Sequence, residues 1–337
     1  MRARGVLLPL LVISLFAQTL GARSAEARRG PAPTVDQLLD LQDRPFAIGH
    51  RGFGENLGED PSRPIENTVR AVRSGFRAGV SVVEVDVQLT RDGQVAVFHD
   101  DFLADFTCIN QLTLAELRDR EPQIPSLADV LEQARQFGRQ SGPLRGLVIV
   151  ELKAAAPLCD PDDGQEPAIV ATVVGVIREM DMAKQTMLAS LSPALLYLAA
   201  AEAPEITRVL TVSGLQFLTG LEVEAIFGVP VRAIDKGLDL GLRWGEVGLL
   251  FRLPGYQSVA EVLSTAAVIG ARVVEADLFL LSSAGKPFVE ALQGFGLKVF
   301  GFTANDAEDW FLLESLGVDG IYVNDVPFGV AHQAPMP

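Results

Sequence analysis

The sequence is poor in histidine, cysteine and basic residues. Its 337 residues include three His and two Cys, and 28 Lys and Arg stand against 43 Asp and Glu, a formal net charge of -15. A nucleic-acid surface requires clustered Lys and Arg, and no such cluster occurs beyond the N-terminus. We therefore expect no nucleic-acid partner. Histidines that occur near several carboxylates become candidates for proton transfer, because imidazole titrates near neutral pH.

Long apolar runs are also absent after the N-terminus. Residues 1–27 combine Arg2 and Arg4 with an apolar run over 6–17 and an Ala-Glu-Ala sequence at 25–27, the pattern of an export signal. The run is shorter than the roughly 20 apolar residues that span a bilayer. We predict a cleaved signal peptide over 1–27 and an exported protein, periplasmic or secreted. A retained membrane anchor is the alternative.

The two cysteines are Cys108 and Cys159. In the cytosol they would be interpreted as two unrelated buried thiols, but an oxidising compartment favours pairing. Each cysteine also lies in a loop that follows a predicted strand carrying candidate site residues, so both can reach the same end of the fold. We therefore predict a Cys108–Cys159 disulfide.

Strand-like and helix-like segments alternate through most of the chain. Runs typical of strands lie at 46–50, 80–89, 146–152, 186–191, 206–212, 272–280, 298–303 and 320–323, and helical patterns lie at 66–78, 126–137, 167–180 and 306–316. This alternation predicts a parallel α/β architecture, and strands that are apolar on both faces fit a sheet covered by helices. Residues 28–45 form a lead-in with a short helix expected near 36–41, and 46–330 form one domain.

The stretch from Leu215 to Gln257 is less regular. It mixes Gly and Pro with apolar residues, among them Phe217, Phe227, Trp244, Phe251 and Tyr256. We favour a crossover helix with irregular packing, because scattered aromatic residues are normal. The alternative is a cover over the mouth of the fold that contacts a lipid, so a transient contact with a lipid or membrane surface stays open.

Three carboxylates lie on two predicted strands. Glu84 and Asp86 are two positions apart in Val-Glu-Val-Asp-Val, so their side chains share one face and the valines the other. Like charges on one face are costly unless a cation lies between them, and Ca²⁺ and Mg²⁺ prefer carboxylate oxygens. Glu151 and Lys153 share a face at the end of another strand. The alternative for each pair is an ordinary polar surface, but their recurrence favours a metal site.

A hairpin is predicted to follow the strand of Glu84. Asp92-Gly93 is a strong signal for a two-residue hairpin loop. With this loop, His99 lies directly opposite Asp86 and on the same face. A slip of one residue would turn His99 to the other face.

His50 and Arg51 follow the first predicted strand and enter a Gly-containing loop. Catalytic groups lie at the carboxyl ends of strands in α/β barrels. A lone histidine is more often structural, but two histidines near carboxylates suit a general acid and a general base. Arg51 offers bidentate donors to a phosphate.

Taken together, these segments resemble the glycerophosphodiester phosphodiesterase family. The matching segments are His50-Arg51-Gly52, Glu66-Asn67-Thr68, Glu84-Val85-Asp86, His99-Asp100 and Glu151-Leu152-Lys153, with Phe302-Thr303-Ala304-Asn305 and Gly317-Val318-Asp319-Gly320-Ile321 near the end. The resemblance implies a TIM-type (β/α)8 barrel and a divalent cation, Ca²⁺ or Mg²⁺. It also implies hydrolysis of small-molecule glycerophosphodiesters to glycerol 3-phosphate and an alcohol.

The resemblance also implies a role for each residue. The acid/base pair would be His50 and His99, and the metal ligands would be Glu84, Asp86 and Glu151. Arg51 and Lys153 would hold the phosphate. Glu66 would support the metal shell or orient His50, and Asn67 would also support the site. The glycerol 2-hydroxyl of the substrate would attack phosphorus, and water would then open the cyclic phosphate.

Departures from the family pattern leave the substrate open. The loop between Gly52 and Glu66 is lengthened, and Phe302 stands where the family has Trp. One alternative is a related lipid phosphodiesterase, either a lysophospholipase D or a phospholipase C-like enzyme. A second is an exported binding protein that holds phosphate esters without hydrolysing them. The oligomeric state is not indicated.

Overall fold

The structure is a computed structural model in which we describe residues 32–41, 44–139, 144–155, 159–162, 164–217 and 255–336. The predicted signal peptide over 1–27 and most of the stretch 215–257 lie outside these residues. Two aromatics of that stretch are described: the ring of Phe217 lies 5.8 Å from Tyr256 and 6.2 Å from Phe288. Both therefore pack towards the protein interior.

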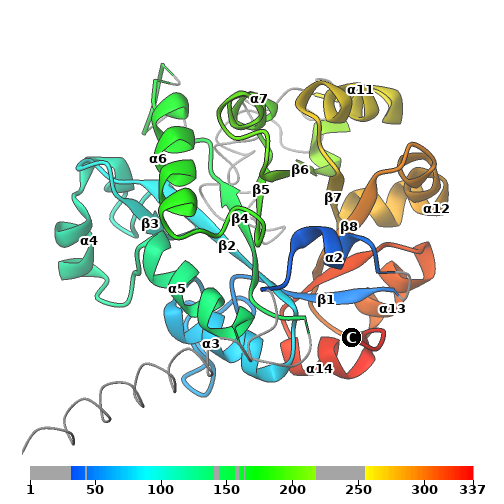
Figure 1. Cartoon of the computed structure of the whole chain (residues 1–337), viewed down its shortest axis with the longest axis horizontal. Coiled ribbons are helices and arrows are strands. Elements are labelled where there is room, and N and C mark those ends of the chain that lie inside the picture. The colour runs from blue at the N-terminus through cyan, green and yellow to red at the C-terminus, as the bar shows by residue number, and fades with distance from the viewer. Residues whose placement is uncertain are drawn as a thin grey trace, which may run out of the picture.

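Parallel strands close into a barrel (Figure 1). They are β1 (Phe46–Gly49), β2 (Val82–Leu89), β4 (Leu147–Leu152), β5 (Thr186–Ser190), β6 (Thr207–Val212), β7 (Val273–Asp277), β8 (Lys298–Ala304) and β9 (Gly320–Val323). Each pairs with the next, and β1 pairs with both β9 and β2, which closes the ring. The predicted TIM-type (β/α)8 barrel is confirmed.

Helices surround the barrel (Figure 1). They are α3 (Val69–Ala78), α5 (Leu127–Gly138), α6 (Glu166–Glu179), α7 (Pro193–Glu202), α11 (Val259–Ile269), α12 (Leu278–Gly294), α13 (Ala307–Leu316) and α14 (Val326–His332). Two further helices lie elsewhere: α2 (Val35–Leu39) covers one end of the barrel, and α4 (Leu114–Arg120) lies outside the ring of helices (Figure 1). Several begin at a side-chain cap, as α13 does: Asp306 accepts hydrogen bonds from the backbone N–H groups of Glu308 and Asp309. Within the described ranges, none of these helices has both the length and the apolar character needed to span a bilayer.

The alternation of side chains along β2 divides the core. Val83, Val85 and Val87 pack outward against the helices, whereas Val82 packs inside the barrel with residues of β1 and β4. Three side chains of α2, Val35, Leu38 and Leu39, belong to the inner cluster. The residues that follow Val82 on its face are Glu84 and Asp86, so the barrel interior changes from apolar to acidic along the strand.

The hairpin forms, but its predicted register was wrong by one residue. Val87 pairs with Val97 of β3 (Val95–Val97), and the backbone N–H of Phe98, not a group of His99, donates to the carbonyl of Asp86. The loop holds three residues because the Thr90 hydroxyl bonds within it, and Gly93 adopts φ +71. His99 still reaches the site, since β3 ends at Val97 and the chain leaves the ladder before it.

The predicted Cys108–Cys159 disulfide is present. It joins the loop after β3 to the loop after β4. Asn110 adds a hydrogen bond from its side-chain amide to the Cys159 carbonyl, with a distance of 2.8 Å. The two loops are therefore linked beside the carboxyl ends of β2 and β4.

Candidate active site

Three carboxylates converge at the carboxyl ends of two neighbouring strands. Glu84 and Asp86 come from β2, and Glu151 of β4 pairs with Asp86 in the parallel register. One oxygen from each lies within 4.8 Å of the others. Glu84 and Asp86 are only 3 % and 1 % exposed. The structure thus brings together the three predicted metal ligands and excludes the solvent-facing alternative for this strand face.

Asp86 is surrounded by donors. Its Oδ1 lies 3.0 Å from the Lys153 ammonium, and its Oδ2 accepts a hydrogen bond of 2.8 Å from the Asn67 side chain. The side-chain oxygen of Asn67 accepts in turn from the Asp86 backbone N–H. Burial opposes ionisation of Asp86, but Lys153, His99 and Arg51 outweigh it and hold the pKa of Asp86 well below its usual value. Asp86 is therefore a carboxylate at neutral pH.

Glu84 is the least satisfied of the three acids. Its Oε2 accepts from the backbone N–H of Arg51 at 2.9 Å, whereas its buried Oε1 has no hydrogen-bond partner among the described residues. Burial, followed by the charges of Asp86 and Glu151, raises the pKa of Glu84 well above its usual value. A bare buried carboxylate oxygen is costly, and a divalent cation would remove that cost.

The acidic cluster fits a hard divalent cation. Ca²⁺ binds oxygen ligands at about 2.3–2.6 Å, so two of its ligand oxygens lie at most about 5 Å apart. The 4.8 Å limit that encloses one oxygen of each of the three acids satisfies this condition. Together with the unsatisfied Oε1 of Glu84, the oxygen-only donor set supports the predicted site.

Arg51 links this cluster to the loop after β1. Its guanidinium Nη1 donates to Glu66 Oε1 at 2.9 Å, and its Nε lies 3.6 Å from Asp86 Oδ2. Glu66 accepts from the Asn56 backbone N–H through its other oxygen. Arg51 adopts φ +48, an uncommon conformation for a non-glycine residue that is concentrated at functional sites. Its guanidinium and the Lys153 ammonium line one cavity, as expected of groups that hold a phosphate.

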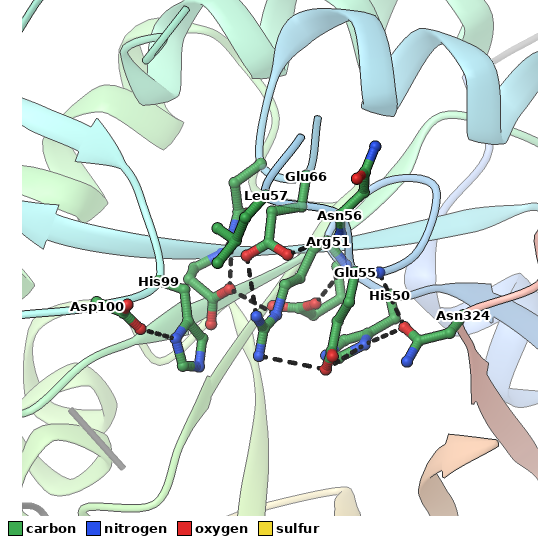
Figure 2. Close-up of polar contacts among 12 residues, drawn as sticks. His50, Arg51, Glu55, Asn56, Leu57, Glu66, His99, Asp100 and Asn324 are labelled. Carbon is green, nitrogen blue, oxygen red and sulfur yellow. Dashed lines mark hydrogen bonds and ion pairs between the residues drawn. The ribbon is translucent and has the colours of Figure 1, made fainter. Parts of the chain in front are cut away.

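His50 lies on one side of Arg51 and His99 on the other (Figure 2). His50 Nδ1 is 2.9 Å from the side-chain oxygen of Asn324. Burial and the neighbouring Arg51 lower the pKa of His50 to about 4, so the ring is neutral at pH 7. A neutral imidazole held through one nitrogen can accept a proton on the other.

The pKa of His99 is shifted in the opposite direction. Its Nδ1 lies 2.6 Å from Asp100 Oδ1. Burial and the cations Arg51 and Lys153 lower its pKa, but Asp86 and the bond to Asp100 outweigh them, so the pKa of His99 lies above its usual value. Both histidines line one cavity of about 90 Å³ with Glu84 and Glu151. A histidine with a lowered pKa and a histidine with a raised pKa therefore face the same space.

Sequence reasoning missed several residues of this site. Asn324 follows β9, and the pairing of Gly49 with Val323 places it beside His50; barrel closure between the first and last strands could have indicated this contact. Glu275 of β7 also lines the cavity. It accepts hydrogen bonds from Thr211 and Tyr322, and no sequence pattern marked it.

Comparison with known proteins agrees with this geometry. The family model described as the glycerophosphoryl diester phosphodiesterase family matches residues 50–219, half of the chain. The chain belongs to this family. The matched segment contains both histidines and all three acids of the cluster.

Individual relatives are similar over shorter segments. A glycerophosphocholine phosphodiesterase of Eremothecium gossypii is 34 % identical over 117 residues, 34 % of this chain and 9 % of the relative. A glycerophosphodiester phosphodiesterase of Caldanaerobacter subterraneus is 26 % identical over 160 residues, 43 % of this chain and 57 % of the relative. The chain thus spans less than two thirds of the length of either.

The barrel itself is shared with solved structures. A phosphodiesterase of Oleispira antarctica, solved in complex with the product sn-glycerol-3-phosphate, has a TM-score of 0.59 at 22 % identity. The match covers 85 % of this chain and 95 % of that structure. At this identity the similarity shows the fold.

Proposed function

We propose that this protein hydrolyses glycerophosphodiesters to sn-glycerol 3-phosphate and an alcohol in a reaction that depends on Ca²⁺ or Mg²⁺. The observation that carries the proposal is one cavity lined by two histidines of opposite protonation preference, a buried acidic cluster and two cations. Family membership and the product bound to the Oleispira relative support the substrate class.

The histidines divide the proton transfers between them. His50, neutral at pH 7, accepts the proton of the glycerol 2-hydroxyl as that oxygen bonds to phosphorus. His99, protonated, donates to the departing alcohol oxygen as its bond to phosphorus breaks. Water then opens the cyclic phosphate with the two roles reversed, so both histidines regain their starting states.

The remaining groups bind and orient the ester. Arg51 and Lys153 hold the phosphoryl oxygens, and Glu66 and Asn67 fix Arg51 and Asp86 in place. Glu84, Asp86 and Glu151 would hold the cation, which when bound stabilises negative charge on the phosphoryl oxygens. Asn324 and Asp100 orient the two rings.

We also propose that the protein is exported. The signal-like pattern over residues 1–27 and the disulfide, which persists in oxidising compartments, both support export. N-terminal sequencing of protein recovered outside the cytoplasm of an expressing cell tests this. A mature N-terminus close to residue 28 is expected, and an intact Met1 would contradict cleavage.

The activity is tested with purified protein and glycerophosphocholine. Release of sn-glycerol 3-phosphate, measured with a coupled dehydrogenase, is expected with Ca²⁺ or Mg²⁺ and not with EDTA. Binding of the ester without turnover under every metal condition would favour the non-catalytic alternative and contradict the proposal.

A further inference from the structure

A second cavity, larger than the catalytic one, lies beside it. Its volume is about 510 Å³, within the 300–1,000 Å³ typical of small-molecule sites. Its walls are mainly apolar and include Leu57, Ile65, Phe98, Phe102, Leu103 and Phe106. The reaction proposed above uses none of these side chains.

The two cavities are separated by one layer of polar side chains. Asp100 lines the larger cavity and bonds to His99, which lines the catalytic one. Glu66 lines the larger cavity and bonds to Arg51 in the same way. Figure 2 shows Leu57 beside Glu66, above Arg51. A substrate bound at the catalytic cavity therefore has an apolar space within reach of its outer part.

The charges around the larger cavity disfavour an anionic occupant. Among its described lining residues there is no Lys or Arg, so an anion finds no partner there. The carboxylates of Glu66 and Asp100 are engaged by Arg51 and His99, and Glu121 adds a third carboxylate to the wall. The walls are mostly hydrocarbon, and an apolar surface of this kind favours the binding of an aliphatic chain.

Phe106 is an exposed aromatic in a strained conformation at this cavity. It adopts φ +64, which is a rare outlier for a bulky residue, and it remains 52 % exposed. The centre of its ring lies 5.3 Å from that of Phe102, and the disulfide at Cys108 holds the end of its loop. Strained backbone conformations are concentrated at functional sites, so this one points to a functional role for Phe106. Leu57, also 52 % exposed, lines the same cavity.

We propose that this cavity binds the acyl chain of a lysophospholipid whose phosphodiester occupies the catalytic site. The inference rests on the proposed function and narrows its substrate class. Water is added across the bond between phosphorus and the head-group oxygen: that bond breaks, phosphorus gains the hydroxyl oxygen, and the head-group alcohol takes a proton. The products are a lysophosphatidic acid and the alcohol.

Chain binding is tested without turnover. Dodecylphosphocholine, below its critical micelle concentration, is titrated calorimetrically into the wild-type protein, Phe106→Asn and the control Phe295→Asn. Asn tolerates the left-handed backbone at position 106, and Phe295 is an exposed aromatic on another part of the molecule. We expect the dissociation constant to rise about tenfold or more in Phe106→Asn and to stay unchanged in Phe295→Asn.

The dependence of affinity on the length of the ligand's alkyl chain is a second test of the same site. Each added methylene should tighten binding to the wild type by up to about fourfold until the cavity is filled. Equal affinities for short and long chains, or equal affinities in all three proteins, would overturn the inference. Binding seen only above the critical micelle concentration would also overturn it, because Phe106 would then contact a lipid surface.

Turnover separates this inference from the proposed function. The ratio of kcat/KM for lysophosphatidylcholine to that for glycerophosphocholine should fall at least about tenfold in Phe106→Asn and not in Phe295→Asn. If the wild type hydrolyses neither ester, the proposed function fails, while the calorimetry still decides whether the cavity binds a chain. If it hydrolyses glycerophosphocholine but binds no chain, only the cavity inference fails.

Discussion

The backbone N–H of Arg51 donates to one oxygen of Glu84 and leaves the other oxygen of that buried carboxylate without a donor. Of the three acids, Glu84 is therefore the one whose ionised form most needs a bound cation. Asp86 is satisfied by Lys153 and Asn67, so it can remain ionised without a metal. Glu84 cannot do so cheaply, because its environment raises its pKa.

We therefore predict that Glu84→Gln removes metal binding without unfolding the protein. In the wild type, Ca²⁺ at a hundred times its dissociation constant should raise the free energy of unfolding by about 2.7 kcal/mol. In Glu84→Gln this gain should disappear, while metal-free stability stays equal or rises because a buried charge is lost. Thermal unfolding with Ca²⁺ or EDTA measures both. The exposed Glu314→Gln is the control, and a metal-dependent shift that persists in Glu84→Gln would exclude this carboxylate as a ligand.

The two histidines predict a bell-shaped pH dependence. Activity requires neutral His50, so kcat/KM should fall as the pH drops towards its pKa of about 4. It also requires protonated His99, so kcat/KM should fall again as the pH rises through a pKa above the usual histidine value. Asp100→Asn weakens a contact that raises that pKa, so the alkaline limb should move to lower pH. Full pH profiles of both proteins test this.

Each histidine should also be necessary on its own. His50→Ala or His99→Ala should lower kcat by about 10²–10⁴-fold, the usual contribution of a proton-transfer group, with little change in the circular dichroism spectrum. His332→Ala is the control, because that residue is exposed on α14, packs against Phe311 and Phe328, and does not line the catalytic cavity. Wild-type turnover in either site variant would mean that another group transfers the proton.

The disulfide should stabilise the protein mainly through chain entropy. Cys108 and Cys159 are separated by 51 positions, and loops of this size give about 2–4 kcal/mol. Urea unfolding of Cys108→Ser/Cys159→Ser should show a loss of that order. Peptide mapping of the unreduced wild type should recover the linked pair, and two free thiols in correctly folded protein would contradict the pairing.

The strands and the acidic cluster could be predicted because both depend on local periodicity. Alternation along Val-Glu-Val-Asp-Val sets which side chains face inward, and the ends of parallel strands meet at one rim. The length of the loop at Asp92-Gly93 was predicted incorrectly, because hydrogen bonds of the Thr90 hydroxyl stabilise a three-residue loop and not the two-residue one. His99 was placed correctly only because the chain leaves the ladder before it.

Other features depend on contacts between distant parts of the chain. Asn324 meets His50 across 274 positions, which requires the closed barrel. The apolar cavity is formed by the loop after β1 together with the segment that contains Phe106. The periodicity of the sequence does not predict that these two segments meet. The left-handed backbone of Phe106 could not be read from the sequence either, since Gly, Asn and Asp are the residues that usually mark it.

Glu275 provides a prediction that concerns stability alone. It is a buried residue that lines the cavity and accepts hydrogen bonds from Thr211 and Tyr322, and burial raises its pKa from 4.5 to about 7. The unfolded chain releases this proton near pH 4.5 and the folded one only near pH 7, so folding loses stability as the pH rises between those values. The loss reaches at most about 3 kcal/mol.

In Glu275→Gln this titration is absent, while the amide can still bond to both hydroxyls. The difference in unfolding free energy between Glu275→Gln and the wild type should therefore move in favour of the variant from pH 5 to pH 8. Urea unfolding in metal-free buffer at the two pH values measures it, with Glu314→Gln as an exposed control. A difference that is the same at both pH values would show that Glu275 ionises normally in the folded protein.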